Sequence, residues 1–361
     1  MPTTHHLPEM KEFWIKFELP FLILSILCGK QSIALEIPNF ILNNGRRIPS
    51  IGFGTWMAKD QDLEIALDEA LEAGYRYIDT AYLYENEKVI GKVLKRWIAE
   101  KKLKREDLFI LSKLPPSGNR PEGVSKYLKK SLENLQLDYL DMYLIHVPFA
   151  FKEDGNNLYP LAPDNRSIDM DSTTDLRAIW QEMEQQVNAG LTKSIGLSNF
   201  NVTQIERVLK NSWIKPSALQ IELNLYLQQK KLVEFCKENN ILVIAYSPLG
   251  SPGLRKFYEQ FKEKIDLPDL LGDRTVKAIA DKYSKKTSQI ILRFYIQSGI
   301  VPIPKSINPS RIRMNLDIFD FQLDDQDMGE LKSLDKNRRI LHFSDLFKGI
   351  QNHPEYPFKE Q

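Results

Sequence analysis

Four polar side chains of the kinds used in proton transfer stand near the ends of apolar runs in the first half of the chain. Asp79 lies near the end of YRYIDT, Tyr84 follows in the same loop, Lys113 ends LFILSK and His146 ends LDMYLIH. An ammonium near a phenol favours the phenolate, so we expect Lys113 to lower the pKa of Tyr84 and make it a proton donor. Asp79 would pair with Lys113, and His146 would orient a substrate oxygen by a hydrogen bond.

Taken singly, each of these side chains has an ordinary structural interpretation. An aspartate at a strand end is often a helix cap, a lysine after a strand usually points to solvent, and a histidine is often a satisfied core residue. The four become specific only together, and only where the fold brings their strand ends to one place. The catalytic hypothesis therefore depends on the elements that carry them.

The chain alternates eight strand-length apolar runs with helix-length amphipathic segments. Such alternation is typical of parallel strands joined by right-handed crossovers. The strand candidates are SIGFGT, YRYIDT, LFILSK, LDMYLIH, KSIGLS, LQIELN, LVIAYS and VPIPKS. The predicted helices include Leu63 to Ala73, Gly123 to Leu135, Thr174 to Ala189, Thr203 to Leu209, Gln229 to Asn239 and Arg274 to Tyr283.

Eight such units favour a closed (β/α)8 TIM barrel, in which side chains at the carboxyl ends of the strands share one face. An open doubly wound sheet usually has a glycine-rich turn after its first strand, whereas GFGTW offers only Gly52 and Gly54. The segment IPNFILNNGRRIPSIG predicts an N-terminal β-hairpin that turns at Asn44 and Gly45 and covers the bottom of the barrel. The tail from Leu334 is expected to form a C-terminal mouth loop, within a single barrel domain over residues 35–361.

Composition excludes several classes of function. The 361 residues include 49 basic and 48 acidic side chains, so the clustered basic excess of a nucleic-acid-binding protein is missing. Only Cys28 and Cys236 are present, which excludes a disulfide framework, and the five histidines show no metal-ligand spacing. We therefore expect no metal and no nucleic acid, and a monomer that acts on a small molecule.

Residues 1–34 have the layout of a secretory signal peptide. Lysines precede the apolar run FLILSILC, and small residues follow as far as Ala34. This run is too short to span a bilayer, and no other stretch approaches the roughly 20 apolar residues needed. Sequons at Asn165 and Asn201 are compatible with secretion. The alternative is an unstructured leader on a cytosolic protein.

Motifs spread along the chain resemble those of the aldo-keto reductase family. They are GYRYIDTAYLYENEKVIG, SKLPP, LDMYLIHVP, KSIGLSNFN, LQIELN, AYSPLGSP and IPKSINPSRIRMN, and the match runs from about residue 35 to the C-terminus. The resemblance implies NADPH-dependent reduction of aldehydes or ketones to alcohols. It places Asp79, Tyr84, Lys113 and His146 at the family's four catalytic positions, whereas Tyr82 matches none of them.

The resemblance also implies a set of residues that bind NADPH. Ser198, Asn199 and Gln220 would hold the nicotinamide carboxamide, and Tyr246 would stack on the ring. The other implied cofactor residues are Gly54, Thr55, Ser247, Leu249, Ser251, Lys305, Ser306, Arg311 and Asn315. Among these, the two cations and the hydroxyl at 305, 306 and 311 match positions that hold the 2′-phosphate, which favours NADPH over NADH. Met314 replaces the Glu or Gln that family members usually carry at the adenine site.

The implied substrate pocket contains Trp56, Leu83, His146 and Val147. Val147 stands where the family often has a large aromatic residue, and Pro115 stands where aldose-reducing members often have a tryptophan. Losing two aromatic walls would widen the pocket. We therefore expect a bulkier aldehyde or ketone, sugar-derived or steroid-like.

Two other functions compete with carbonyl reduction. The first is a catalytically silent NADP-binding barrel with a regulatory or structural role, against which the four intact catalytic residues count. The second is a (β/α)8 hydrolase, which would need paired carboxylates or a metal cluster across the mouth, and neither spacing is visible.

Overall fold

The computed structural model describes residues 37–260 and 265–358, and these contain a closed barrel of parallel strands. The strand order is β12-β11-β10-β9-β6-β5-β4-β3, so neighbours in space follow one another along the chain. The eight runs predicted from the sequence are all confirmed as its strands. Their bounds are β3 (Phe53–Gly54), β4 (Tyr77–Asp79), β5 (Phe109–Leu114), β6 (Met142–Ile145), β9 (Ile195–Ser198), β10 (Ala218–Glu222), β11 (Leu242–Tyr246) and β12 (Val301–Pro302).

The barrel closes where its first strand meets its last. The Gly52 N–H donates to the Pro302 carbonyl at 3.0 Å, and the Gly54 N–H donates to the Pro304 carbonyl at 3.1 Å. A Cβ on Gly54 would lie 2.8 Å from the Ile303 carbonyl oxygen, which is closer than packing allows. Glycine is therefore required where the two strands approach each other.

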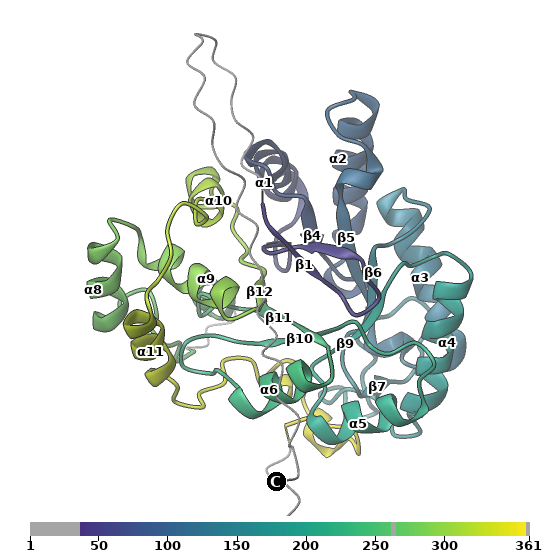
Figure 1. Ribbon diagram of the computed structural model, residues 1–361. Coiled ribbons are helices and arrows are strands. Elements are labelled where there is room, and N and C mark those ends of the chain that lie inside the picture. The colour runs from purple at the N-terminus through teal and green to yellow at the C-terminus, as the bar shows by residue number, and fades with distance from the viewer. Residues whose placement is uncertain (1–36, 261–264, 359–361) are drawn as a thin grey trace, which may run out of the picture. The chain divides into compact units, whose positions relative to one another are not determined.

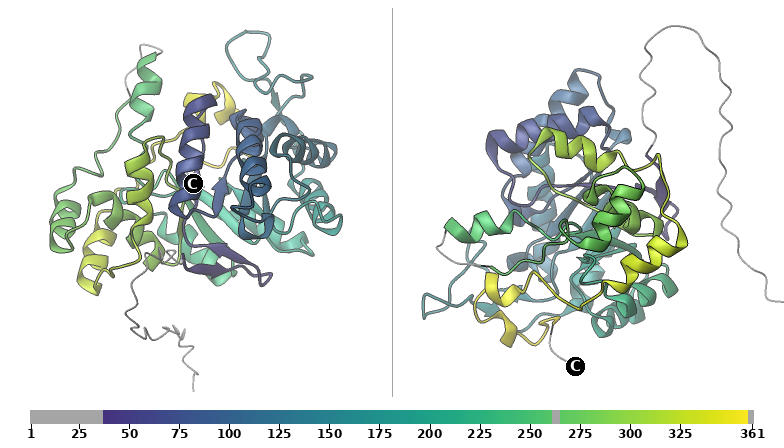
Figure 2. Two further views of the ribbon diagram at one scale, coloured as in Figure 1. Left: turned by 90° about the horizontal axis from the view of Figure 1, so that it is seen from above. Right: turned by 90° about the vertical axis from the view of Figure 1, so that its left-hand side faces the viewer.

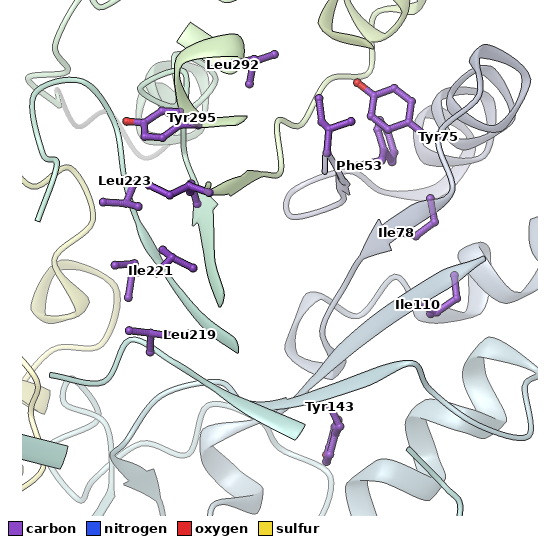
Figure 3. Packing of buried hydrophobic residues seen from close by; sticks show 14 of the residues in the cluster. Phe53, Tyr75, Ile78, Ile110, Tyr143, Leu219, Ile221, Leu223, Leu292 and Tyr295 are labelled. Atoms are coloured by element: carbon purple, nitrogen blue, oxygen red, sulfur yellow. The ribbon is translucent and has the colours of Figure 1, made fainter. Parts of the chain in front are cut away.

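Helices surround the strands (Figure 1). The first shows how the sequence produces them: α1 (Asp60–Ala73) buries Leu63, Leu67 and Ala70 on one stripe and ends at Gly74, whose φ is 115°. Figure 3 shows the buried side chains that fill the layer between strands and helices. The other main helices are α2 (Glu87–Ala99), α3 (Pro121–Leu135), α4 (Leu176–Asn188), α5 (Val202–Asn211), α6 (Lys230–Glu238), α7 (Leu254–Gln260), α8 (Arg274–Lys282), α9 (Thr287–Gln297), α10 (Pro309–Leu316) and α11 (Asp325–Ser333).

An antiparallel hairpin closes the amino-terminal end of the barrel, as the sequence predicted. Strands β1 (Asn39–Ile41) and β2 (Arg47–Pro49) pair across a turn in which Gly45 has a φ of 79°. Ile48 and Leu42 are buried against interior residues of the barrel strands. Asn44 Nδ2 also donates to Ser194 Oγ at 2.9 Å, which fixes the hairpin to the start of β9.

The C-terminal segment, residues 334–358, covers the opposite end of the barrel. The left view of Figure 2 shows this segment in yellow at one end and the hairpin in purple at the other. The rings of the C-terminal segment pack against the loop after β6, where β7 (Ala150–Phe151) and β8 (Met170–Asp171) form a short antiparallel pair. The expectation of a mouth loop is confirmed. We call the resulting set the mouth cluster: Val147, Phe149, Phe151, Ile168, Phe343, Phe347, Ile350 and Tyr356.

Residues 1–34, with their predicted signal peptide and cleavage position, lie outside the described residues. Among the helices of the described part, none combines the length and the hydropathy required to cross a bilayer.

Candidate active site

A buried ion pair lies at the centre of the mouth. Lys113 Nζ donates to Asp79 Oδ1 at 2.6 Å and to the Thr80 carbonyl at 2.8 Å. The two side chains are 0% and 2% exposed. Strands β4 and β5 are paired neighbours, so their carboxyl ends deliver the two charges to one place. A buried ammonium is stable only with such partners, so the pair depends on both residues.

The other carboxylate oxygen of Asp79 accepts hydrogen bonds from two further side chains. Asp79 Oδ2 accepts the Tyr77 hydroxyl at 3.1 Å and Gln220 Nε2 at 2.6 Å. The carboxylate is thus held by groups from β4, β5 and β10. Hydrogen bonds from three strands therefore fix the orientation of the carboxylate.

Tyr84 lies beside this pair. Its hydroxyl is 3.4 Å from Lys113 Nζ, and its ring meets the His146 ring edge-on with centroids 5.6 Å apart. The four side chains that the sequence predicted to converge therefore do so. Tyr82, two residues earlier, instead packs its ring against Tyr127, away from the ion pair.

Sequence reasoning did not identify the side chain that holds the Tyr84 loop. Asn86 is 2% exposed, and its Nδ2 donates to the Thr55 and Ala58 carbonyls at 2.9 and 3.0 Å. Its Oδ1 accepts the Thr80 hydroxyl at 3.0 Å. One amide thus joins the loops that follow β3 and β4. A polar residue two positions after a candidate acid was the only signal for it in the sequence.

The expectation that Lys113 lowers the pKa of Tyr84 is wrong for this structure. Burial and the Asp79 carboxylate hold the pKa of Tyr84 well above its ordinary value. Burial of the phenol is the main cause, because it disfavours the charged phenolate, and the Asp79 carboxylate beside Lys113 acts in the same direction. Tyr84 therefore keeps its proton at neutral pH, and the acid is present in the form that can donate.

His146 is held in the neutral form. Burial and the nearby Lys113 ammonium keep the pKa of His146 well below its usual value. Its Nδ1 is buried and receives no hydrogen bond from the part of the chain that the structure describes. The ring lies edge-on to the Tyr84 ring, so a carbonyl oxygen placed at the Tyr84 hydroxyl would also lie near the neutral imidazole.

The residues implied for the nicotinamide form a polar group that adjoins the ion pair. Asn199 Nδ2 donates to Ser198 Oγ at 3.0 Å and to the His146 carbonyl at 2.9 Å, and its Oδ1 accepts the Tyr246 hydroxyl at 2.8 Å. Gln220 reaches Asp79, as described above. Amide, hydroxyl and aromatic groups thus meet at one edge of the mouth, which suits a flat ring with a carboxamide.

The implied pyrophosphate loop follows β11 and contains several left-handed residues. Ser247 and Ser251 have φ of 54° and 48°, Gly250 has φ of 77°, and the hydroxyls of the two serines lie 2.7 Å apart. Leu249 between them is partly buried against the core. Hydroxyls on such a tight turn fit the chemistry of phosphate oxygens.

The implied 2′-phosphate residues gather at the start of α10. Lys305 and Arg311 are exposed, and neither forms an ion pair with any residue in 37–260 or 265–358. Ser306 Oγ accepts the Asn308 N–H at 3.1 Å, and Asn315 is buried one turn after Arg311. Cations and a hydroxyl close to a helix N-terminus suit a phosphate dianion.

Two implied residues of the first strand serve the barrel itself. Thr55 is fully buried, and its hydroxyl donates to the Asp79 carbonyl at 2.8 Å. Gly54 forms part of the barrel closure described above. Both therefore shape the floor beneath the implied cofactor position.

The pocket residues lie in two apolar groups at the mouth. Trp56 packs on a buried apolar cluster that includes Ile340 and Leu341 of the C-terminal segment. Leu83 packs on the mouth cluster, and Val147 is 3% exposed within it. Val147 is thus packed among the rings of the mouth cluster, and the widening expected from the sequence stays a prediction.

The described residues contain no group of three or more His, Cys, Asp or Glu side chains arranged to hold a metal ion. The arrangement instead combines a protonated tyrosine, a neutral histidine and a polar edge for a nucleotide. These are groups for proton and hydride transfer to a carbonyl.

Comparison with known proteins agrees with this chemistry. Residues 50–336 match the model of the aldo/keto reductase family. The chain is 42% identical over 325 residues to aldo-keto reductase family 1 member A1 of Gallus gallus, covering 88% of this chain and 97% of that protein. It is 41% identical to prostaglandin F synthase 1 of Bos taurus, with 89% and 97% covered. The structure of the aldose reductase from Schistosoma japonicum is 39% identical, with a TM-score of 0.81 and 90% and 100% covered. The chain therefore belongs to the aldo/keto reductase family.

Proposed function

We propose that Tyr84 donates the proton and His146 orients the carbonyl oxygen in the reduction that this NADP-dependent oxidoreductase carries out. When bound, NADPH supplies the hydride. As the carbonyl carbon accepts hydride, its oxygen becomes a strongly basic alkoxide, and the Tyr84 hydroxyl can then transfer its proton although its pKa is high. The neutral His146 ring stabilises the same oxygen by a hydrogen bond.

The observation that carries this proposal is the position of the Tyr84 hydroxyl, 3.4 Å from the Nζ of an ammonium that Asp79 fixes at 2.6 Å. Proton transfer leaves a phenolate at Tyr84, and the Lys113 ammonium is the positive charge nearest to it. The Lys113 ammonium therefore offsets part of the cost that burial and the Asp79 carboxylate place on that phenolate. Asp79 holds the ammonium in place and keeps it charged.

The test is steady-state oxidation of NADPH by the purified full chain with a reactive aldehyde, followed by the absorbance of the reduced cofactor. Continuous, aldehyde-dependent oxidation supports the proposal. Tight NADPH binding without turnover would instead support the silent, cofactor-binding alternative.

We propose a bulky, apolar carbonyl as the preferred substrate. Apolar and aromatic side chains surround the mouth, with Trp56 on one side and the mouth cluster on the other. The names of two relatives above refer to different compounds, a prostaglandin and an aldose, so their similarity does not choose among substrates. A panel that runs from short sugar aldehydes to polycyclic ketones tests this, and a kcat/KM highest for the short sugars would contradict it.

Secretion is a separate proposal, supported by the layout of residues 1–34. Of the two sequons, Asn165 is exposed, whereas Asn201 Oδ1 accepts the Gln204 N–H at 3.0 Å and caps α5. A secreted chain is therefore expected to carry a glycan at Asn165 and none at Asn201. The mass of the protein recovered from the medium of eukaryotic secretory cells tests this. An intact chain confined to the cytosol would contradict secretion.

A further inference from the structure

A buried carboxylate that takes no part in the chemistry above holds the C-terminal segment to the barrel. Glu222 is the last residue of β10 and is 0% exposed. Its Oε1 accepts the Ile340 N–H at 2.8 Å, and its Oε2 accepts the Leu341 N–H at 2.9 Å. One side chain thus binds two consecutive backbone amides that lie far away in the sequence.

The position of Glu222 in its strand aims it at the mouth. Side chains alternate along a strand, and Leu219, Ile221 and Leu223 lie on the helix side of β10 (Figure 3). Glu222 therefore shares the interior face with Gln220, which bonds Asp79. The carboxylate lies one layer above the catalytic ion pair, at the level where the C-terminal segment crosses.

Such a carboxylate remains buried only with strong partners. Besides the two amides, Asn224 Nδ2 donates to it at 3.2 Å, and Arg339 lies 3.9 Å away. Hydrogen bonds to a charged acceptor are about twice as strong as neutral ones. The C-terminal segment is therefore fixed most firmly at residues 340 and 341.

The fixed segment forms walls of the pocket. Ile340 and Leu341 belong to a buried apolar cluster against which Trp56 and Tyr246 pack. Phe343, two residues further on, enters the mouth cluster beside Phe149, with ring centroids 5.4 Å apart. The position in which Glu222 holds the C-terminal segment therefore sets the distance between the apolar side chains of that segment and the reacting carbonyl.

We infer that Glu222 is a positioning residue that determines selectivity for large substrates by holding the C-terminal segment over the active site. This inference rests on the proposed function, because it concerns the same pocket. Glu222 reaches the substrate only through the segment that it anchors. Its loss should therefore weaken the binding of substrates that touch these walls and leave the chemical step intact.

The chain offers a matched control. Glu184 on α4 is 4% exposed, and its Oε1 accepts the N–H groups of Trp213 and Ile214 at 2.7 and 2.9 Å. It is thus a second buried carboxylate that binds two consecutive amides, but in the loop that precedes β10, at the amino-terminal end of the barrel. Glu184→Gln should lose a similar interaction without moving the mouth.

The experiment compares Glu222→Gln with Glu184→Gln in the full chain. In Glu222→Gln, amide hydrogen exchange of peptides containing Ile340 and Leu341 should become faster. KM should rise by about tenfold for a polycyclic ketone and by less than about twofold for a short aldehyde, with kcat nearly unchanged. In Glu184→Gln, both KM values and the exchange of these peptides should match the wild type.

Three results would overturn the inference. They are equal changes of KM for both substrates, the same loss of selectivity in Glu184→Gln, or faster exchange without any change of selectivity. Wild-type protein that shows no turnover would instead refute the proposed function, and the exchange measurement would still report on the anchor. Should Glu222→Gln fail to fold, Glu222→Asp keeps the charge on a shorter side chain and should give a smaller shift in the same direction.

Discussion

The two ends of the barrel are built from the same strands but carry opposite chemistry. At the amino-terminal end, Ile48 and Leu42 of the hairpin are buried against apolar interior residues such as Tyr77 and Phe109. At the carboxyl end, two residues after Tyr77 on β4, Asp79 pairs with Lys113 among polar partners. The closed end is thus mainly apolar, whereas the mouth concentrates buried charge.

The difference shows that residues near the start of a barrel strand contribute mainly to stability, whereas residues at its end contribute mainly to function. Apolar burial at the closed end stabilises the barrel without any need for precise geometry. The buried ion pair at the mouth requires exact partners and contributes little net stability. Substitutions at the two ends should therefore fail in different ways, and the following predictions test that separation.

The largest effect is expected from Tyr84→Phe at the mouth. It removes the proton donor, so kcat should fall by about 100- to 10,000-fold. NADPH affinity and the free energy of unfolding should barely change, because among the described residues the Tyr84 hydroxyl makes one long hydrogen bond, at 3.4 Å. Steady-state kinetics, cofactor titration and urea unfolding measure the three quantities.

Tyr82→Phe is the matched control for this change, since Tyr82 packs on Tyr127 and not on the ion pair. It should retain nearly full turnover. Wild-type kcat in Tyr84→Phe would remove Tyr84 from its assigned role.

At the closed end, Ile48→Ala should show the reverse pattern. The side chain is fully buried, so truncation should lower the free energy of unfolding by about 2–5 kcal/mol. The kcat of the folded fraction should stay within a factor of about two. Urea unfolding and kinetics at low temperature check this. A large loss of kcat with unchanged stability would show that the two ends are not separable.

A smaller effect, on cofactor affinity, is expected from a substitution at the rim of the mouth. Arg311→Ala should weaken NADPH binding by about 1.5–3 kcal/mol, the range for hydrogen bonds to charged groups, and leave NADH binding nearly unchanged. Isothermal titration with each cofactor measures both affinities. Arg313→Ala is the control on the same helix, because Arg313 pairs with Glu69 instead. Equal losses for both cofactors in Arg311→Ala would contradict the phosphate site.

The smallest effect concerns pH at the mouth. Because the pKa of His146 is depressed by burial and by Lys113, its contribution to stability is complete above the unfolded value of about 6.5. This contribution is lost as pH falls through the folded value, with a slope of at most about 1.4 kcal/mol per pH unit. Urea unfolding between neutral and acid pH should therefore show a shallower acid slope for His146→Gln. Identical slopes would mean that His146 is not buried in the neutral form.

Most of the barrel could be predicted from the sequence because its signals are local. The eight strands are short apolar runs, and Asn44 and Gly45 are a turn signal in adjacent residues. The β7 and β8 pair could not be predicted, because Ala150 meets Asp171 across an irregular loop and each strand has only two residues. Pairings between distant segments leave little trace in local patterns.

The site likewise contains residues that the sequence predicts and residues that it does not. Asp79, Tyr84, Lys113 and His146 follow from strand ends, which the alternation fixes. Glu222 was hidden, because its role depends on the amides of a segment far along the chain. The pKa of Tyr84 also could not be inferred, since its direction depends on the burial of the phenol and on the distance of Asp79 from Lys113.

The glycine closure between β3 and β12 has a consequence for the order in which the chain acquires its structure. Both hydrogen bonds of this closure join residues near the start of the barrel to residues made near its end. A nascent chain therefore exposes an unpaired edge on β3 until most of the polypeptide has left the ribosome. Unpaired edges recruit other strands, and distant pairings form slowly. The period before closure is thus when this protein is most exposed to aggregation, and chaperones would act on it then.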